Sequence, residues 1–91
     1  MSKYRIHQHK KFKRDFKTCA KRGYDMALLI MVMDKLERGE PLDLAVNRPH
    51  PLIGTNPALI ECHIKTDWLL IYRFTDDELI FIRTGTHSDL F

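Results

Sequence analysis

The chain has 91 residues, of which 44% are hydrophobic and 30% are charged. This length predicts a single domain over residues 1–91 with a small core, and the composition excludes a disordered chain. The longest uninterrupted apolar run, Met26 to Met33, is far too short to cross a membrane, and no signal segment precedes it. We therefore expect a cytoplasmic protein without a membrane partner.

The net charge of +3 conceals a strong asymmetry along the chain. Residues 1–22 hold nine Lys or Arg and one Asp, whereas the remainder holds six Lys or Arg against eleven Asp or Glu. A basic end of this kind is typical of polyanion binding, although a solvated helix face is its commoner meaning. We interpret it as a nucleic-acid contact. Cys19 and Cys62 fall at apolar positions, which indicates buried thiols in a reducing compartment.

Two helices are predicted after a short strand over residues 4–8. In residues 9–22, Phe12, Phe16 and Cys19 recur at helical spacing, and lysines fill the opposite face. The lysines expected to contact RNA are Lys10, Lys11, Lys13 and Lys17. A membrane-surface role for this helix is disfavoured because the apolar stripe is needed to cover the sheet. The second helix covers residues 25–38, with Asp25 as its N-cap and Gly39 at its end.

Residues 40–58 form a long irregular segment, and loops of this length are usually functional or disordered. Here Pro49 and Pro51 flank His50, which favours a functional loop that holds this histidine in place.

Three consecutive strands are predicted over residues 60–65, 68–75 and 78–84, separated by short turns. With two-residue hairpin loops, one face is apolar and forms the core side: Ile60, Cys62, Ile64, Leu69, Ile71, Ile80 and Ile82. The other face carries Glu61, His63, Lys65, Trp68, Leu70, Tyr72, Phe74, Leu79, Phe81 and Arg83. Such a face suits RNA, whereas the alternative is a second small core of aromatic residues beneath a loop. The element order βααβββ predicts an α+β fold, with the two N-terminal helices on one face of a small twisted antiparallel sheet.

Three spaced motifs resemble the YafQ branch of the RelE-like toxins, within the RelE/ParE superfamily of toxin–antitoxin proteins. They are His50-Pro51-Leu52-x-Gly54, the run from Glu61 to Tyr72, and Arg83 to Phe91. The resemblance implies the RelE-like fold and a type II toxin: a ribosome-dependent endoribonuclease that cuts mRNA in the ribosomal A site, contacts ribosomal RNA, inhibits translation and is silenced by a cognate antitoxin. By the same resemblance, His50, His63, Asp67 and His87 are tied to cleavage, and Trp68 and Phe91 lie near the substrate.

The chemistry expected of these residues needs neither a metal nor a cofactor. A base removes the proton from the ribose 2′-OH, an acid protonates the leaving 5′-oxygen, and a 2′,3′-cyclic phosphate results; histidine suits both proton transfers near neutral pH. We assign His87 as general acid and Asp67 as general base, a pair that can be exchanged, although Asp67 alone also reads as a turn residue. The planar fork of Arg83 suits a phosphate, and Lys65 joins the RNA-binding set.

Two other functions compete with this interpretation. A metal-dependent nuclease is conceivable because His50, Cys62, His63, Asp67 and His87 are all ligand types. Neighbouring strand residues point to opposite faces, however, and the chain has no CxxC or HxxxH pair. A non-catalytic RNA- or partner-binding domain would keep the basic helix and the aromatic residues but would not need all three histidines.

Overall fold

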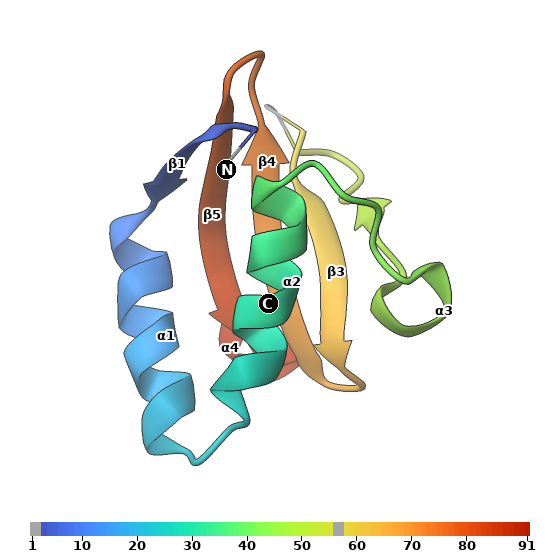
Figure 1. The fold of residues 1–91 in the computed structure, drawn as a ribbon. Helices are drawn as coiled ribbons and strands as arrows, with labels where there is room; N and C mark the ends of the chain where they lie inside the picture. Colours follow the sequence, from blue (N-terminus) through green and yellow to red (C-terminus); the bar gives the residue numbers. More distant parts are fainter. Residues whose placement is uncertain (1–2, 56–57) are drawn as a thin grey trace.

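The computed structural model describes residues 3–55 and 58–91. Residues 56 and 57, in the predicted proline-rich loop, lie outside this description. The elements follow one another as β1 (Arg5–Gln8), α1 (Lys10–Lys21), α2 (Met26–Glu37), α3 (Leu44–Asn47), β2 (His50–Pro51), β3 (Ile60–Lys65), β4 (Trp68–Phe74), β5 (Glu78–Gly85) and α4 (His87–Leu90) (Figure 1). The predicted α+β class is confirmed, and α3, β2 and α4 are short additions to the expected elements.

The sheet has five strands in the order β1-β5-β4-β3-β2. β2, β3, β4 and β5 pair antiparallel with their neighbours, whereas β1 lies parallel to β5 at the edge. The prediction of a purely antiparallel sheet is therefore wrong, and the sheet is mixed. Parallel neighbours need a long crossover connection, which α1, α2 and the segment that follows them supply between β1 and the last three strands.

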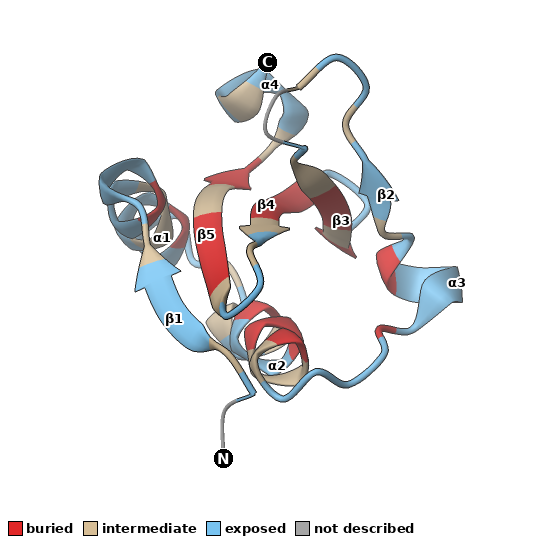
Figure 2. Ribbon diagram, turned by 90° about the horizontal axis from the view of Figure 1, so that it is seen from above, coloured by how far each residue is buried: buried red, intermediate tan, exposed pale blue. Residues whose placement is uncertain are grey.

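The two long helices and the short helix α4 lie on different sides of the sheet. Figure 1 shows α2 lying across one face and α1 running beside β5 at the edge. Viewed from above, α2 lies on one side of the central strands, and α4 with the segment after β2 lies on the other (Figure 2). Among the described ranges, no helix is long and apolar enough to cross a membrane.

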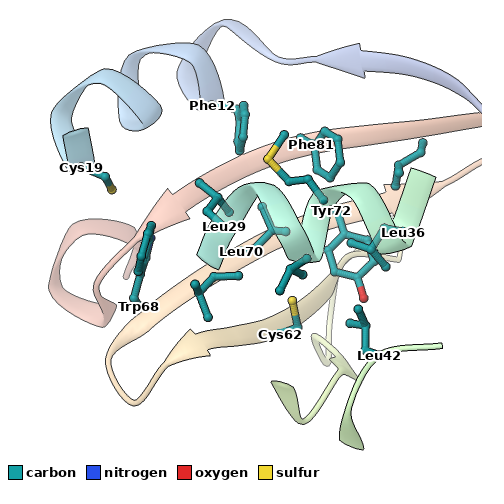
Figure 3. Close-up of a cluster of buried hydrophobic side chains, with 14 residues drawn as sticks. Phe12, Cys19, Leu29, Leu36, Leu42, Cys62, Trp68, Leu70, Tyr72 and Phe81 are labelled. Atoms are coloured by element: carbon teal, nitrogen blue, oxygen red, sulfur yellow. The ribbon is translucent and has the colours of Figure 1, made fainter. Parts of the chain in front are cut away.

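The main core lies between the sheet and the two long helices (Figure 3). Phe12 from α1 stacks on Phe81 with ring centroids 5.5 Å apart, and Leu29 of α2 is fully buried. Both cysteines are buried free thiols, as predicted, and burial raises the pKa of the Cys62 thiol to about 12. The apolar stripes of α1 and α2 thus cover the sheet, and the thiol of Cys62 stays protonated at neutral pH.

The predicted side of the sheet is correct for β3 and wrong for β4 and β5, although the hairpin between β4 and β5 pairs as predicted near its turn, with Phe74 opposite Leu79. A bulge between His63 and Lys65 shifts the pairing by one residue, so that Cys62 lies opposite Leu70. Because side chains alternate along a strand, a one-residue shift turns all of β4 over, and β5 follows through its own pairing. The aromatic and aliphatic residues that were expected on the RNA face are therefore core residues under the helices: Trp68, Leu70, Tyr72, Leu79 and Phe81.

The opposite face keeps Glu61 and His63, as predicted, and the strand residues beside them are aliphatic, with Arg73 and Arg83 farther along. Leu69 and Ile71 lie opposite His63 and Glu61, and both are buried although they do not belong to the cluster under the helices. Figure 2 shows α4 and the segment after β2 on this side of the sheet. A second buried layer therefore exists beneath a loop, and it consists of aliphatic rather than aromatic side chains.

The different burial of Trp68 and Phe91 predicts different effects of their substitution on the free energy of unfolding. Trp68 is 3% exposed and its indole Nε1 donates to Thr84 Oγ1 at 3.0 Å, whereas Phe91 is 70% exposed. Trp68→Ala should lower the free energy of unfolding by about 3–5 kcal/mol, because it leaves a large cavity. Phe91→Ala should change it by less than about 0.5 kcal/mol, as surface substitutions do. Urea unfolding of both variants tests this difference, and equal effects would contradict the burial of Trp68.

Candidate active site

Three histidines from separate elements form a row on the face of the sheet opposite α2. The ring centroids of His50 and His63 lie 6.5 Å apart, and those of His63 and His87 lie 6.2 Å apart. β2 pairs with β3 so that His50 lies opposite Glu61, which places it beside His63 two residues along. His87 reaches the row because α4 begins directly after β5. The structure therefore brings together the three histidines that the sequence singled out.

His87 forms a close pair with Asp67, which lies in the turn between β3 and β4. The Nδ1 of His87 lies 2.6 Å from Asp67 Oδ1, and the backbone N–H of His87 donates to the same oxygen at 3.0 Å. These two hydrogen bonds from His87, the backbone one first, lower the pKa of Asp67. The carboxyl group is thus ionised at neutral pH and holds one side of the imidazole.

His50 has an oxygen atom near each of its two ring nitrogens. Its Nδ1 lies 3.2 Å from the carbonyl oxygen of Arg48, and its Nε2 lies 3.7 Å from Glu61 Oε1. A carbonyl oxygen only accepts hydrogen bonds, so this contact requires the proton on Nδ1. Glu61 is a buried carboxylate that the sequence-based assignment of roles missed. The available signal was its position in β3, two residues from His63 and therefore on the same face.

His63 lies in the middle of the row and is half-buried. Its backbone carbonyl accepts a hydrogen bond from Asn47 Nδ2 at 2.7 Å, which fixes the strand beside α3. Its Nδ1 is buried and has no hydrogen-bond partner among the residues that the structure describes. Buried polar atoms normally have a partner, and an orphan of this kind is costly, which marks the atom for a functional explanation.

The residues predicted to contact RNA fall into three groups. Lys65 and Phe91 are exposed, and the Phe91 ring lies 6.4 Å from that of His87, where a base could stack. Trp68 does not face the histidines: it packs under the helices against Tyr24, with centroids 4.9 Å apart. The predicted place of Trp68 near the substrate is thus not seen, because the bulge after His63 turns it inward. The four lysines of α1 are all exposed, as predicted: Lys10, Lys11, Lys13 and Lys17.

Arg83 is already engaged within the protein. Its Nε donates to Asp15 Oδ2 at 2.6 Å and its Nη2 donates to Asp15 Oδ1 at 3.2 Å, while Asp15 Oδ2 also accepts the backbone N–H of Thr84 at 3.2 Å. Its side chain is 28% exposed. A phosphate contact by Arg83 therefore stays a prediction, and any such contact must share the guanidinium with Asp15.

Comparisons with known proteins give the family. The family described as "Bacterial toxin of type II toxin-antitoxin system, YafQ" matches residues 4–91. The mRNA interferase toxin YafQ of Escherichia coli strain K12 is 40% identical over 80 residues, which cover 88% of this chain and 87% of the relative.

Solved structures give the same result. The E. coli DinJ-YafQ toxin–antitoxin complex contains a chain with a TM-score of 0.91 and 39% identity, with 98% of both chains covered. A metal-bound toxin from Helicobacter pylori has a TM-score of 0.89 and 38% identity, with 97% of this chain and 99% of that chain covered. The chain therefore belongs to the YafQ family of bacterial toxins of type II toxin–antitoxin systems.

Proposed function

We propose that this chain is an mRNA interferase: an endoribonuclease toxin that cuts mRNA in the ribosomal A site, acts in the cytoplasm and is silenced by a cognate antitoxin. The observation that carries the proposal is the row of three histidines with Asp67 paired to His87. Its support also includes the relatives, which are named mRNA interferase toxin YafQ and were solved as a complex with DinJ. Histidines gathered in this way supply the two proton transfers that cleavage at a ribose 2′-OH requires.

His87 is the general acid in this proposal, and Asp67 orients it. The carboxylate binds His87 through Nδ1, which leaves Nε2 to donate a proton to the departing 5′-oxygen. The lowered pKa of Asp67 makes this carboxylate a weak base, since it holds a proton poorly at neutral pH. We therefore replace the earlier assignment of Asp67 as general base with an orienting role that also stabilises the imidazolium form of His87.

His50 is the general base. With its Nδ1 proton directed to the carbonyl of Arg48, the neutral imidazole presents a lone pair on Nε2. That nitrogen can take the proton of the 2′-OH, and the nearby carboxylate of Glu61 then stabilises the positive charge that forms. His63, between the two, contacts the scissile phosphate from the middle of the row. Acid and base thus act from opposite ends of the row, as in-line attack requires.

The remaining contacts position the RNA. Lys65 and the lysines of α1 attract the phosphate backbone, and Phe91 offers an exposed ring on which a base can stack. An open face cannot by itself bend a flexible mRNA into the geometry of attack, and the ribosomal A site supplies that constraint. Alignment of the reacting groups can lower a barrier by several kcal/mol, roughly up to 7–11 in favourable cases.

Substitution of His87 tests the chemistry. In His87→Ala, single-turnover cleavage of mRNA on programmed ribosomes should fall by about 10²–10⁴-fold, the usual contribution of one general acid. His7→Ala is the matched control, because His7 is an exposed histidine of β1 outside the row. Wild-type cleavage should yield a 2′,3′-cyclic phosphate, identified by mass analysis of the 3′ end. Full activity in His87→Ala would refute the acid role of His87 and favour the metal-dependent candidate.

A metal-dependent nuclease is the second candidate, because a relative from H. pylori was solved with a bound metal. In the described part of this chain, no three His, Cys, Asp or Glu side chains come together as a metal-holding group. The same assay separates the two chemistries. Cleavage should persist after EDTA treatment of the toxin in buffers that keep the ribosomes intact. A 3′-hydroxyl product or loss of activity that a divalent cation restores would favour the metal-dependent candidate.

The exposed lysines of α1 should act in docking rather than in chemistry. Replacement of Lys10, Lys11, Lys13 and Lys17 by Gln should weaken RNA association and flatten its dependence on salt. The expected change is roughly 0.7 log units per lost phosphate contact for each decade of salt, as for single strands. The cleavage rate at saturating ribosomes should be retained. An unchanged salt slope in a filter-binding titration would show that this helix face is only solvated.

The antitoxin should bind stably enough to abolish toxicity. Expression of this chain alone should arrest growth, and co-expression with the small protein encoded beside it should restore growth and yield a complex on size-exclusion chromatography. The basic N-terminal helix offers an acidic antitoxin segment a complementary surface. Harmless expression of the chain alone, with no co-purifying neighbour, would contradict the toxin role.

A further inference from the structure

The helix that carries His87 is too short to be stable alone. α4 spans only His87–Leu90, and helices of this length do not persist in water without outside contacts. It begins with a capping box, in which Thr86 Oγ1 accepts the N–H of Asp89 at 3.2 Å and Asp89 Oδ2 accepts the N–H of Thr86 at 2.9 Å. Asp89 is therefore the residue on which the shape of this single turn depends.

Asp89 is also the point where α4 is tied to the rest of the protein. Its Oδ2 accepts Arg22 Nη1 at 2.6 Å and its Oδ1 accepts Arg22 Nη2 at 3.0 Å, which is the two-point geometry that arginine forms with a carboxylate. The pair is partly sheltered, with side-chain exposures of 39% for Arg22 and 28% for Asp89. The guanidinium holds the pKa of Asp89 far below its usual range, so this carboxylate stays ionised.

Arg22 is held in place at the C-terminal end of α1 by its backbone and by Tyr24. Its backbone N–H donates to the carbonyl of Thr18 at 3.1 Å, and its guanidinium lies 5.9 Å from the ring centroid of Tyr24. Tyr24 packs edge-on against Trp68, a core residue, with centroids 4.9 Å apart. The contacts of Asp89 therefore lead through Arg22 and Tyr24 to Trp68 in the core.

The residue before this turn leaves room for the carboxylate. Gly85 has a φ of 154°, and a Cβ at this position would lie 2.8 Å from Asp89 Oδ2. Any larger residue would push the carboxylate away from its partners. The space at Gly85, the capping box with Thr86 and the ion pair with Arg22 thus all favour the same position of Asp89. With α4 held in this way, the backbone N–H and the Nδ1 of His87 both face Asp67.

We propose that Arg22 and Asp89 are positioning residues that hold α4 so that His87 keeps both of its hydrogen bonds to Asp67. This inference rests on the proposed function only in so far as His87 takes part in cleavage. Neither Arg22 nor Asp89 needs to touch the substrate. Loss of either one lets the turn loosen, and His87 then leaves the geometry in which Nε2 faces the 5′-oxygen.

The first test is a titration that does not depend on activity. In wild-type protein, hydrogen bonds from His87 lower the pKa of Asp67. In Arg22→Gln these bonds weaken, so the Asp67 pKa should rise toward the ordinary value of an aspartate, as followed by the ¹³C shift of its carboxyl group. In Asp89→Ala the rise should be smaller, because the charge of Asp89 itself raises the Asp67 pKa and is lost in this variant. Arg22→Lys should restore part of the shift. Arg38→Gln, which removes an exposed arginine paired with Asp34 on α2, is the matched control and should leave it unchanged.

The second test uses single-turnover cleavage on ribosomes. At saturation the rate should fall about 10- to 100-fold in Asp89→Ala and Arg22→Gln, since misplacement by 1 Å can cost about 10². In a His87→Ala background the same changes should have no further effect, because they act through His87. Arg22→Gln leaves the capping box intact. If Asp89→Ala does not fold, Arg22→Gln alone is sufficient for both the titration and the cleavage assay.

Two results would overturn the inference. One is an unchanged Asp67 pKa in both variants, and the other is a rate loss that multiplies with that of His87→Ala, which indicates a direct contact with RNA. If His87→Ala itself is fully active, the proposed acid role of His87 fails, and the titration alone then decides whether Arg22 and Asp89 position His87.

Discussion

The bulge between His63 and Lys65 decides which side of the sheet each later residue occupies. Without it, the tight turn that follows would place Trp68, Tyr72 and their neighbours on the open face; with it, these large side chains lie under the helices. The face that carries Glu61 and His63 then contains no large aromatic side chain of β4. α4 and the segment after β2 lie on that side of the sheet. A one-residue irregularity thus separates the aromatic core from the face on which the histidines lie.

The elements of this fold are readable from the sequence because they follow local periodicity and capping. The 3.6-residue spacing of Phe12, Phe16 and Cys19 and the expected N-cap at Asp25 predicted helices whose bounds differ from the structure by about one residue. Asp25 occupies the N-cap position, but its side chain forms no capping hydrogen bond there. Pairing across the sheet is a different matter, since it depends on contacts distant in sequence. No glycine marks the bulge in the sequence. The parallel pairing of β1 depends on the position of β5, which lies about 70 residues later in the chain. Neither could be derived from the residues alone.

The three histidines of the candidate site were singled out because their chemistry is specific and their motifs resembled a known family. Their supports were not found. Glu61, Arg22 and Asp89 look like ordinary surface charges in the sequence, and only the fold shows that Glu61 lies beside His50 and that Arg22 pairs with Asp89 of α4. Charged groups that act through another residue carry no local pattern, so a structure is needed to recognise them.

The outer edge of the sheet beside the site is closed to further strands. β2 has only two residues, and Pro51 has no N–H to offer to a neighbour. Beyond the end of the β2–β3 pairing, the side chain of Asn47 occupies the carbonyl of His63, as the adjoining strand of a longer sheet would do. Such edges discourage the strand-to-strand association by which sheets aggregate. A macromolecule that approaches the histidines from this side must therefore bind through side chains and shape, and cannot extend the sheet.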